Sequence, residues 1–270
     1  LLRIFCEPRV DEIMILPPTY GMYKVSAGIS DVAIKEVSLT ADFQPDVEAI
    51  LAAVTSNTKL LFLCSPNNPT ANDFDRSVII ELVQKFPGIV VVDEAYIDFT
   101  NQQSLVADLG QYENLVVMQT FSKAWGLAGI RLGMAFASEE IIHYFNKVKP
   151  PYNVNQLSQN AALAAMDKKE KQELEVAIIL SERAKLIQAL EDLDLVERVF
   201  PTSANFILIR VNDALSLYNQ LVEKKIIVRN RSNVHLCEGG LRISVGRPEE
   251  NDRLIQVLNQ FSHAENLIPG

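Results

Sequence analysis

Short apolar runs alternate with helical patterns along the first half of the chain, and this alternation restricts its fold more than any other feature. The apolar runs lie at residues 13–16, 32–39, 59–65, 89–96, 115–121 and 130–137. Between them lie stretches with a helical pattern, near residues 45–54, 75–86 and 138–148. Several runs are continuously apolar, which is typical of strands covered on both faces. We predict an α/β fold: a mostly parallel sheet with helices on both faces.

The pattern changes after residue 155. Residues 156–194 are rich in Ala, Leu, Glu and Lys, as long helices are. Strand-like runs follow at 196–200, 204–210, 225–229 and 241–246, with a predicted helix over 213–224 and a last helix from Pro248. We therefore predict a large domain over 1–155, linking helices over 156–190 and a smaller α+β domain over 191–270.

The composition excludes several classes of function. Lys and Arg number 25 against 34 Asp and Glu, and the net charge of −9 argues against a nucleic-acid binder. No apolar run reaches the roughly 18 residues of a membrane span. The spacing of the three cysteines and three histidines does not fit a metal site. We expect no nucleic-acid, membrane or metal partner, and a reducing compartment, the cytoplasm.

The chain begins with LLRIF, which lacks Met and reads as the middle of an apolar helix. We therefore expect the large domain to be incomplete at its N-terminus. An organelle-targeting segment upstream is compatible with this expectation.

The segment TFSKAWGLAGIRLG (120–133) places a lysine just after a strand. Burial and neighbouring cations would lower the pKa of Lys123, and an unprotonated amine is what a Schiff base to a carbonyl cofactor requires. Thr120, Ser122 and Arg131 are types of residue that hold a phosphate. The alternative is a solvated lysine in a glycine-rich loop.

The segment VVVDEAYIDF (90–99) ends a strand in a carboxylate. A buried Asp93 needs a partner, and a protonated pyridine nitrogen would serve. Asp93 and Tyr96 would point to opposite faces of a straight strand, so a turn must separate them if both bind one ligand. Tyr96 would then donate to a cofactor oxygen. Glu94 and Asp98 are interpreted as surface or structural residues.

Two more loops follow strands. In SPNNPTAN (65–72), Asn68 can donate to the same cofactor oxygen, although Asn-Pro pairs also end strands as simple turns. In PPTYGMY (17–23), Tyr20 is placed to stack on a flat cofactor. Each loop alone has an ordinary structural explanation, whereas all four segments together follow strands of one sheet.

Taken together, these segments resemble the fold-type I aminotransferases that use pyridoxal 5′-phosphate, and most closely the histidinol-phosphate aminotransferases. The resemblance covers essentially the whole chain and includes IIVR (226–229) and LRISVGRPEEN (241–251). It implies that the large domain binds the cofactor and that the active sites lie at a homodimer interface. The implied reaction interconverts L-histidinol phosphate and 2-oxoglutarate with imidazole acetol phosphate and L-glutamate, in histidine biosynthesis.

The resemblance also implies roles for single residues. The catalytic set is Lys123 as the Schiff-base lysine, Asp93 as the partner of the ring nitrogen, and Tyr96 as a donor to the ring oxygen. The cofactor-binding set is Tyr20, Asn68, Asp93, Tyr96, Thr120, Ser122, Lys123 and Arg131. The substrate-binding set is Tyr20, Asn68, Arg229 and Arg242. Arg231 and Arg247 match no residue of the family pattern and are interpreted as surface residues.

Two features depart from the family pattern. Ala71 stands where relatives have glycine, so the turn must either avoid positive φ or be strained. The relatives' upstream phosphate-binding loop, and a tyrosine that they lend to the neighbouring subunit, are not among these 270 residues. Two alternatives stay open: another enzyme with the same cofactor (an aromatic aminotransferase or a threonine-phosphate decarboxylase), or a non-catalytic chain that only folds and dimerises.

Overall fold

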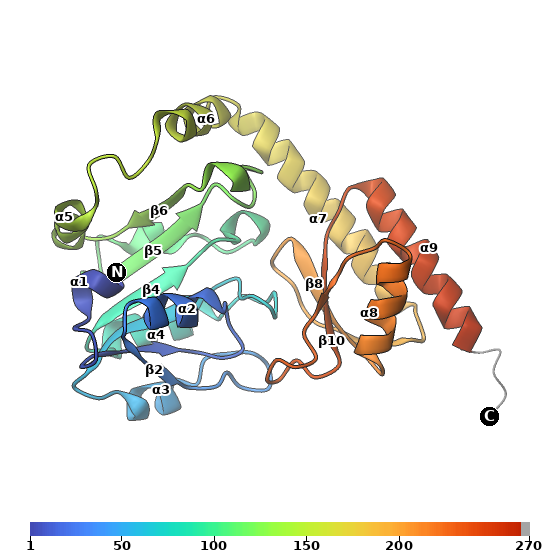
Figure 1. Ribbon diagram of the computed structural model, residues 1–270, viewed down its shortest axis with the longest axis horizontal. Helices are drawn as coiled ribbons and strands as arrows, with labels where there is room; N and C mark the ends of the chain where they lie inside the picture. Colours follow the sequence, from blue (N-terminus) through green and yellow to red (C-terminus); the bar gives the residue numbers. More distant parts are fainter. Residues whose placement is uncertain (266–270) are drawn as a thin grey trace.

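A six-stranded sheet forms the first half of the molecule in the computed structural model, which describes residues 1–265. Its order is β2-β1-β3-β4-β5-β6. The strands are β1 (Glu12–Ile15), β2 (Ala33–Glu36), β3 (Thr58–Cys64), β4 (Ile89–Asp93), β5 (Leu115–Thr120) and β6 (Gly133–Phe136). The first five are parallel, and β6 pairs antiparallel with β5 at one edge. The predicted mostly parallel sheet is confirmed (Figure 1).

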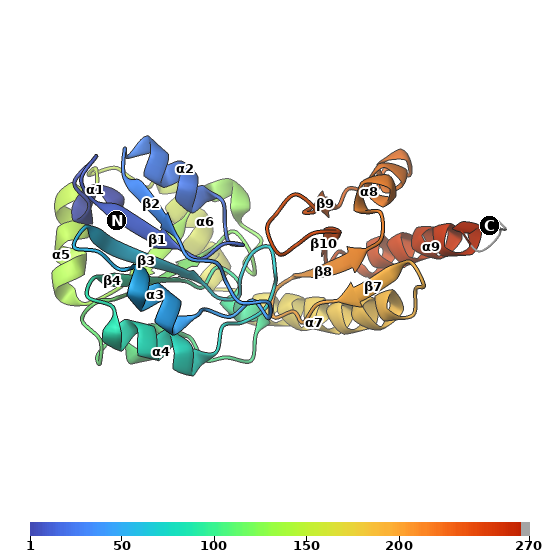
Figure 2. The ribbon, with the colours of Figure 1, turned by 90° about the horizontal axis from the view of Figure 1, so that it is seen from below.

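Helices cover both faces of this sheet. They are α1 (Leu2–Phe5), α2 (Met22–Ile29), α3 (Val47–Ala53), α4 (Arg76–Lys85) and α5 (Glu139–Val148). Successive strand residues point to opposite faces. Accordingly, Leu61 and Leu63 of β3 pack with buried residues of α3 and α4, whereas Leu60 and Phe62 pack with residues of α2 and α5. The prediction of helices on both faces is also confirmed (Figure 2).

Capping residues begin the helices that connect the central strands. The Asp46 side chain accepts from the Ala49 N–H before α3, and the Asp75 side chain accepts from the Ser77 N–H before α4. Such caps satisfy N–H groups that have no partner inside the helix. Because β3, β4 and β5 are parallel, their carboxyl ends share one edge of the sheet, where ligands bind in folds of this type.

A second, four-stranded antiparallel sheet lies beyond the first, in the order β7-β8-β10-β9. Its strands are β7 (Val196–Val199), β8 (Phe206–Val211), β9 (Arg229–Asn230) and β10 (Gly240–Ser244). The helices of this half are α6 (Gln156–Met166), α7 (Lys169–Glu191), α8 (Ala214–Glu223) and α9 (Pro248–Glu265). Helix α7 runs from the large sheet to the small one (Figure 1). Among the described helices, none combines the length and apolar character needed to cross a membrane.

One predicted strand is mostly wrong. The run 225–229 was expected to be a strand, but β9 begins only at Arg229. The chain instead leaves α8 through a left-handed residue, Lys225, at φ 61°, and the Ile226 N–H bonds back to the Leu221 carbonyl. The turn that ends α8 therefore takes up the first residues of this run, and the rest of the run up to β9 has no regular structure.

Candidate active site

The carboxyl ends of β3, β4 and β5 surround a cavity of about 560 Å³, which we call the Lys123 cavity. Its lining includes all eight residues predicted to bind a cofactor: Tyr20, Asn68, Asp93, Tyr96, Thr120, Ser122, Lys123 and Arg131. These residues come from four separate segments of the chain. The register explains their meeting, since Cys64 at the end of β3 lies opposite Asp93 at the end of β4.

The loop after β3 is tied to the loop that carries Tyr20. Asn67, which is fully buried, donates from Nδ2 to the Pro18 carbonyl at 2.8 Å and to Thr70 Oγ1 at 2.7 Å. Its Oδ1 accepts from Thr19 Oγ1 at 3.1 Å. Asn67 thus fixes Tyr20 relative to the neighbouring Asn68, a contact between distant segments that the turn motif did not predict.

Ala71 adopts a positive φ of 69°, so the strained alternative is the correct one. A residue with a Cβ costs roughly 1–2 kcal/mol in this conformation. The loop compensates with two backbone hydrogen bonds, from the Ala71 N–H to the Asn67 carbonyl at 2.9 Å and from the Ser203 N–H to the Ala71 carbonyl at 2.7 Å. The second bond joins the loop to the segment that leads into the small sheet.

Asp93 ends β4, and the chain turns immediately after it. Its Oδ1 accepts from the Ala95 N–H at 3.1 Å and its Oδ2 from the Tyr23 hydroxyl at 2.7 Å. Burial raises the pKa of Asp93, while these hydrogen bonds and the charge of Lys123 oppose the rise. Tyr96 lies beyond the turn and lines the same cavity, so the turn required to bring the two side chains together is present.

Lys123 lies beside Tyr96, with its Nζ atom 5.0 Å from the centre of the tyrosine ring. Desolvation lowers the pKa of the Lys123 amine, and the positive charge of Arg242 lowers it further. The charge of Asp93 acts in the opposite direction. The amine is therefore easier to deprotonate than an ordinary lysine, which is a requirement for a nucleophile or a base.

Hydroxyl groups and a guanidinium gather at one side of the cavity. Thr120 Oγ1 donates to Ser122 Oγ at 3.0 Å and accepts from the Ser122 N–H at 3.1 Å. Arg131 is held near them by a bond from Nη1 to the Ala128 carbonyl at 2.9 Å. Such donors together suit an anionic group such as a phosphate.

The small sheet contributes Arg242 of β10 to the edge of this site. Its Nη1 donates to Asn68 Oδ1 at 2.7 Å, and its guanidinium carbon lies 4.7 Å from the centre of the Phe206 ring. Among the described residues, no group bonds the buried Nε of Arg242. Arg229 pairs with Arg242 in the strand register, and neither arginine lines the Lys123 cavity itself. Burial lowers the pKa of Arg242, and the nearby charge of Arg231, interpreted as a surface residue, lowers it further.

Sequence reasoning missed several residues around the site. Tyr23 is buried against Asp93, and Cys64 lines the Lys123 cavity. Of the two interpretations of Glu94, surface or structural, the structural one holds: Glu94 is buried and accepts from Ser104 Oγ at 2.5 Å and from Gln119 Nε2 at 2.9 Å. An available signal was the spacing of Tyr20 and Tyr23, which places both at the start of one helix.

The sheet order and the lysine–carboxylate pair at the strand ends define the fold and site of a fold-type I aminotransferase. The family model described as aminotransferase class I and II matches residues 1–258, and the chain belongs to this family.

Known relatives and solved structures agree with the family. The histidinol-phosphate aminotransferase of Flavobacterium johnsoniae is 52% identical over 258 residues, which are 96% of this chain and 74% of the relative. The histidinol-phosphate aminotransferase of Sinorhizobium meliloti, solved with pyridoxal-5′-phosphate, has a TM-score of 0.87 at 22% identity, with 97% of this chain and 73% of that chain covered. That likeness concerns the fold alone. The L-threonine-O-3-phosphate decarboxylase of Porphyromonas gingivalis has a TM-score of 0.80 at 27% identity and covers 94% and 77% of the two chains.

Proposed function

We propose that this chain is a pyridoxal-phosphate-dependent aminotransferase that transfers an amino group between L-histidinol phosphate and 2-oxoglutarate in histidine biosynthesis. The observation that carries the proposal is the Lys123 amine, which shares one cavity with the buried carboxylate of Asp93. The histidinol-phosphate substrate rests on the name of the relatives that are about half identical to this chain.

The residues of the Lys123 cavity fit the proposed cofactor. A volume of about 560 Å³ lies within the range of small-molecule sites, which is roughly 300–1,000 Å³. The donor set also fits: an amine for the aldehyde, a carboxylate for the ring nitrogen, and hydroxyls with a guanidinium for the phosphate. We assign the ring nitrogen to Asp93 and the phosphate to Thr120, Ser122 and Arg131.

The flat ring has its own set of partners. Tyr20 has an exposed aromatic face at the cavity and would stack on the ring. Tyr96 and Asn68 would donate to the ring oxygen. Because Asn68 Oδ1 already accepts from Arg242, its amide nitrogen is the atom left free to donate.

When bound, pyridoxal phosphate supplies the electron-accepting ring and the carbonyl that carries the amino group. The chain supplies the proton transfers. Lys123 Nζ would take a proton from the substrate carbon that bears the amine and return it later in the reaction, because its lowered pKa makes the free base accessible. Arg242 would bind the anionic end of the substrate, with Arg229 as a second cation at the rim.

We also propose that the protein is a homodimer in the cytoplasm. Within each chain we propose a cofactor-binding part over 1–155, linking helices over 156–190 and a small domain over 191–270. A buried cluster built around the strands of the small sheet supports the division. The main cluster of the large sheet also includes Phe200, Leu208 and Cys237, so the two parts pack against each other. The apolar residues exposed on α6, Leu157, Leu163 and Met166, support a covering partner.

An absorbance experiment tests the function. Pyridoxal phosphate is added to the purified chain, followed by L-histidinol phosphate, and the cofactor spectrum is recorded at each step. We expect the spectrum to change on binding and then to convert to that of the pyridoxamine form. If histidinol phosphate gives no response, conversion by phenylalanine would favour the aromatic aminotransferase. Loss of carbon dioxide from threonine phosphate would instead favour the decarboxylase. No change at either step would support the non-catalytic alternative.

A further inference from the structure

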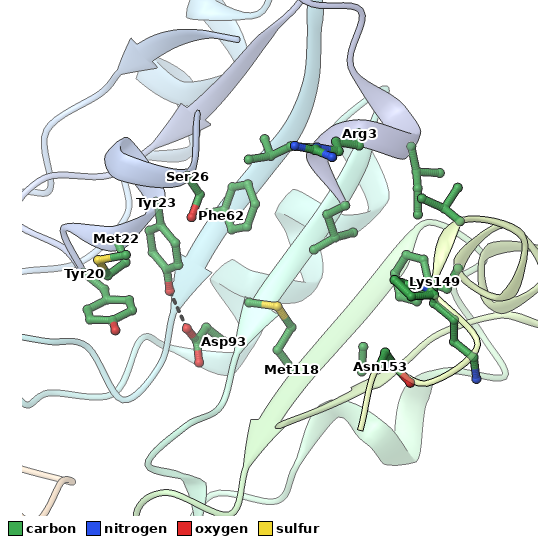
Figure 3. Close-up of a pocket in the computed structure, with 17 residues that line it drawn as sticks. Arg3, Tyr20, Met22, Tyr23, Ser26, Phe62, Asp93, Met118, Lys149 and Asn153 are labelled. Carbon is green, nitrogen blue, oxygen red and sulfur yellow. Dashed lines mark hydrogen bonds between the residues drawn. The ribbon is translucent and has the colours of Figure 1, made fainter. Parts of the chain in front are cut away.

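A second, mostly apolar cavity of about 830 Å³ lies next to the Lys123 cavity, and we call it the Tyr23 cavity. Four residues line both cavities: Tyr20, Asp93, Met118 and Ala135. Asp93 therefore forms part of the boundary between the two spaces. Figure 3 shows the Tyr23 hydroxyl directed at Asp93 from the side of helix α2.

Tyr23 is held in one place by aromatic neighbours. Its ring stacks on Phe62 with centroids 4.9 Å apart, and the Tyr20 ring meets it edge-on at 5.5 Å. The side chain is only 6% exposed. With the ring fixed on two sides, the hydroxyl oxygen lies 2.7 Å from Asp93 Oδ2.

In the hydrogen bond between Tyr23 and Asp93, the tyrosine hydroxyl is the donor and the carboxylate is the acceptor. Burial and the neighbouring charge of Asp93 raise the pKa of Tyr23 well above its usual value, so its hydroxyl keeps its proton and acts as a donor. Asp93 receives one bond at each oxygen, from Tyr23 and from the Ala95 N–H. A carboxylate oxygen has two acceptor positions, so Asp93 can still accept a third hydrogen bond.

We propose that Tyr23 is a positioning residue that fixes Asp93 and favours its ionised form, so that Asp93 can pair with the protonated ring nitrogen of the cofactor. The inference rests on the role proposed for Asp93 above. Tyr23 itself does not line the Lys123 cavity and acts through Asp93. A donor at one oxygen holds the carboxylate in a single orientation and offsets part of the cost of burying its charge.

The test compares cofactor binding by the wild-type chain and by Tyr23→Phe. The variant keeps the ring that packs on Phe62 and loses only the hydroxyl. Binding is followed by the fluorescence of Trp125, which is the only tryptophan of the chain and lies two residues after Lys123. The two probes are pyridoxal phosphate and its 1-deaza analogue, in which carbon replaces the ring nitrogen.

We expect the Kd of Tyr23→Phe for pyridoxal phosphate to rise about tenfold, because a hydrogen bond to a charged group is lost. The Kd for the 1-deaza analogue should stay about the same, because that analogue has no ring nitrogen for Asp93 to bind. Equal losses for both probes would overturn the inference and indicate that the hydroxyl only supports packing. A wild-type chain that binds both probes equally would contradict the role of Asp93, and one that binds neither would contradict the proposed function.

Two further variants keep the result interpretable. Tyr112→Phe is the matched control, since its hydroxyl only accepts from Gln84 at 3.3 Å on the exposed side of the molecule, and it should change neither Kd. In an Asp93→Asn background, Tyr23→Phe should lose most of its effect on pyridoxal phosphate binding, as coupled residues do. An undiminished effect in that background would overturn the inference. Thermal unfolding of each variant shows whether a weakened affinity reflects loss of folded protein.

Discussion

Lys123 is surrounded by groups that have opposite effects on its amine. Desolvation and Arg242 favour the neutral amine, whereas Asp93 favours the protonated one. The lowered pKa of Lys123 shows that the first two effects dominate. A single side chain can therefore act as a nucleophile and as a base, and no other lysine lines the Lys123 cavity among the described residues.

Lys123→Ala should abolish transamination, because no other amine lines the cavity to take its place. Loss of a positioned base alone costs roughly 10²–10⁴ in rate, and loss of the covalent step adds to this. Lys123→Arg should be equally inactive, since guanidinium stays protonated. Lys149→Ala, at the neighbouring Tyr23 cavity, is the control and should keep normal turnover. Steady-state rates measure all three, and more than a trace of activity in Lys123→Ala would contradict the assignment.

Asp93→Asn should gain stability relative to the wild type as the pH rises. Burial raises the pKa of Asp93 in the folded state. Its contribution to stability is therefore full below the unfolded pKa and is lost as the pH rises through the folded pKa, where the carboxylate must ionise inside the protein. The amide of the Asp93→Asn variant does not titrate, so its contribution to stability does not change with pH.

Urea unfolding of the cofactor-free wild type and Asp93→Asn at pH 4 and pH 7 measures this difference. The titratable groups that interact with Asp93 are the hydroxyls of Tyr23 and Tyr96, the Cys64 thiol and the Lys123 amine. The free energy of unfolding of the variant minus that of the wild type should be larger at pH 7. A difference that is larger at pH 4 would mean that the hydrogen bonds to Asp93 outweigh its desolvation.

The sequence predicted the positions of single residues where a functional side chain directly follows a strand. It predicted less where a contact joins segments that lie far apart in the sequence. Lys123, Asp93 and Asn68 each follow a continuous apolar run, so their meeting at one edge follows from a parallel sheet. The contact between Tyr23 and Asp93 spans 70 residues of sequence. It depends on how α2 packs on the sheet, and no local pattern records that packing.

At the scale of elements, continuous apolar runs located the central strands well and the small sheet less well. Both faces of β3 and β4 are buried over most of their length, which favours apolar residues at successive positions. Strand β9 is two residues long at the sheet edge, and the apolar residues before it lie in the irregular segment that follows the turn at the end of α8. The propensity of Ile and Val for strands was overridden there by the geometry of a helix end.

Helix α4 supports the strand that ends at Asp93, and its N-cap offers an element-scale test. Asp75→Ala should lower the free energy of unfolding by about 1 kcal/mol, because the Ser77 N–H loses its acceptor. For a chain of this size that corresponds to a fall in Tm of roughly 2–4 °C. Asp75→Asn is the control that keeps the cap. Equal losses in Asp75→Ala and Asp75→Asn would show that charge and not capping stabilises this helix start.

The effect of Asp75 should also depend on pH. Hydrogen bonds from Ser77 lower the pKa of Asp75. A lowered pKa means that the contribution of Asp75 is present above its unfolded pKa and is lost as the pH falls through the folded value. The loss measured for Asp75→Ala should therefore shrink in acid. Cofactor affinity should be unchanged, since Asp75 does not line the site.

Strand β10 carries Arg242 from the small sheet to the site on the large one. Arg242→Ala should raise KM for both substrates by roughly 10- to 100-fold, the expected effect of losing charge-assisted hydrogen bonds to an anion. The Kd for the cofactor should change far less. Arg247→Ala is the control, because the exposed Arg247 side chain pairs only weakly with Glu250, at 3.9 Å. An equal loss of substrate and cofactor binding by Arg242→Ala would indicate that Arg242 only holds Asn68 in place.

At the scale of the whole molecule, helix α6 exposes apolar side chains that none of the described residues covers. Leu157, Leu163 and Met166 are 81%, 61% and 53% exposed, and Tyr152 in the preceding turn is 93% exposed. At 100° per residue, Leu163 and Met166 lie about 60° apart on α6, and Leu157 lies on the other side of the helix. Large apolar side chains exposed together in one short segment support an interaction surface there. A second copy of this chain is the partner that the proposed dimer provides.

Sedimentation equilibrium should give twice the chain mass of 30.2 kDa for the wild type. Leu157→Glu should shift the equilibrium toward the monomer, because a carboxylate would be buried without a partner at the interface. Leu215→Glu is the control: Leu215 is 61% exposed, against 81% for Leu157, and lies on α8, beside the small sheet. If the site is shared between two copies, the monomeric variant should also lose turnover while keeping its unfolding free energy. A monomeric wild type, or equal shifts in both variants, would contradict an interface at α6.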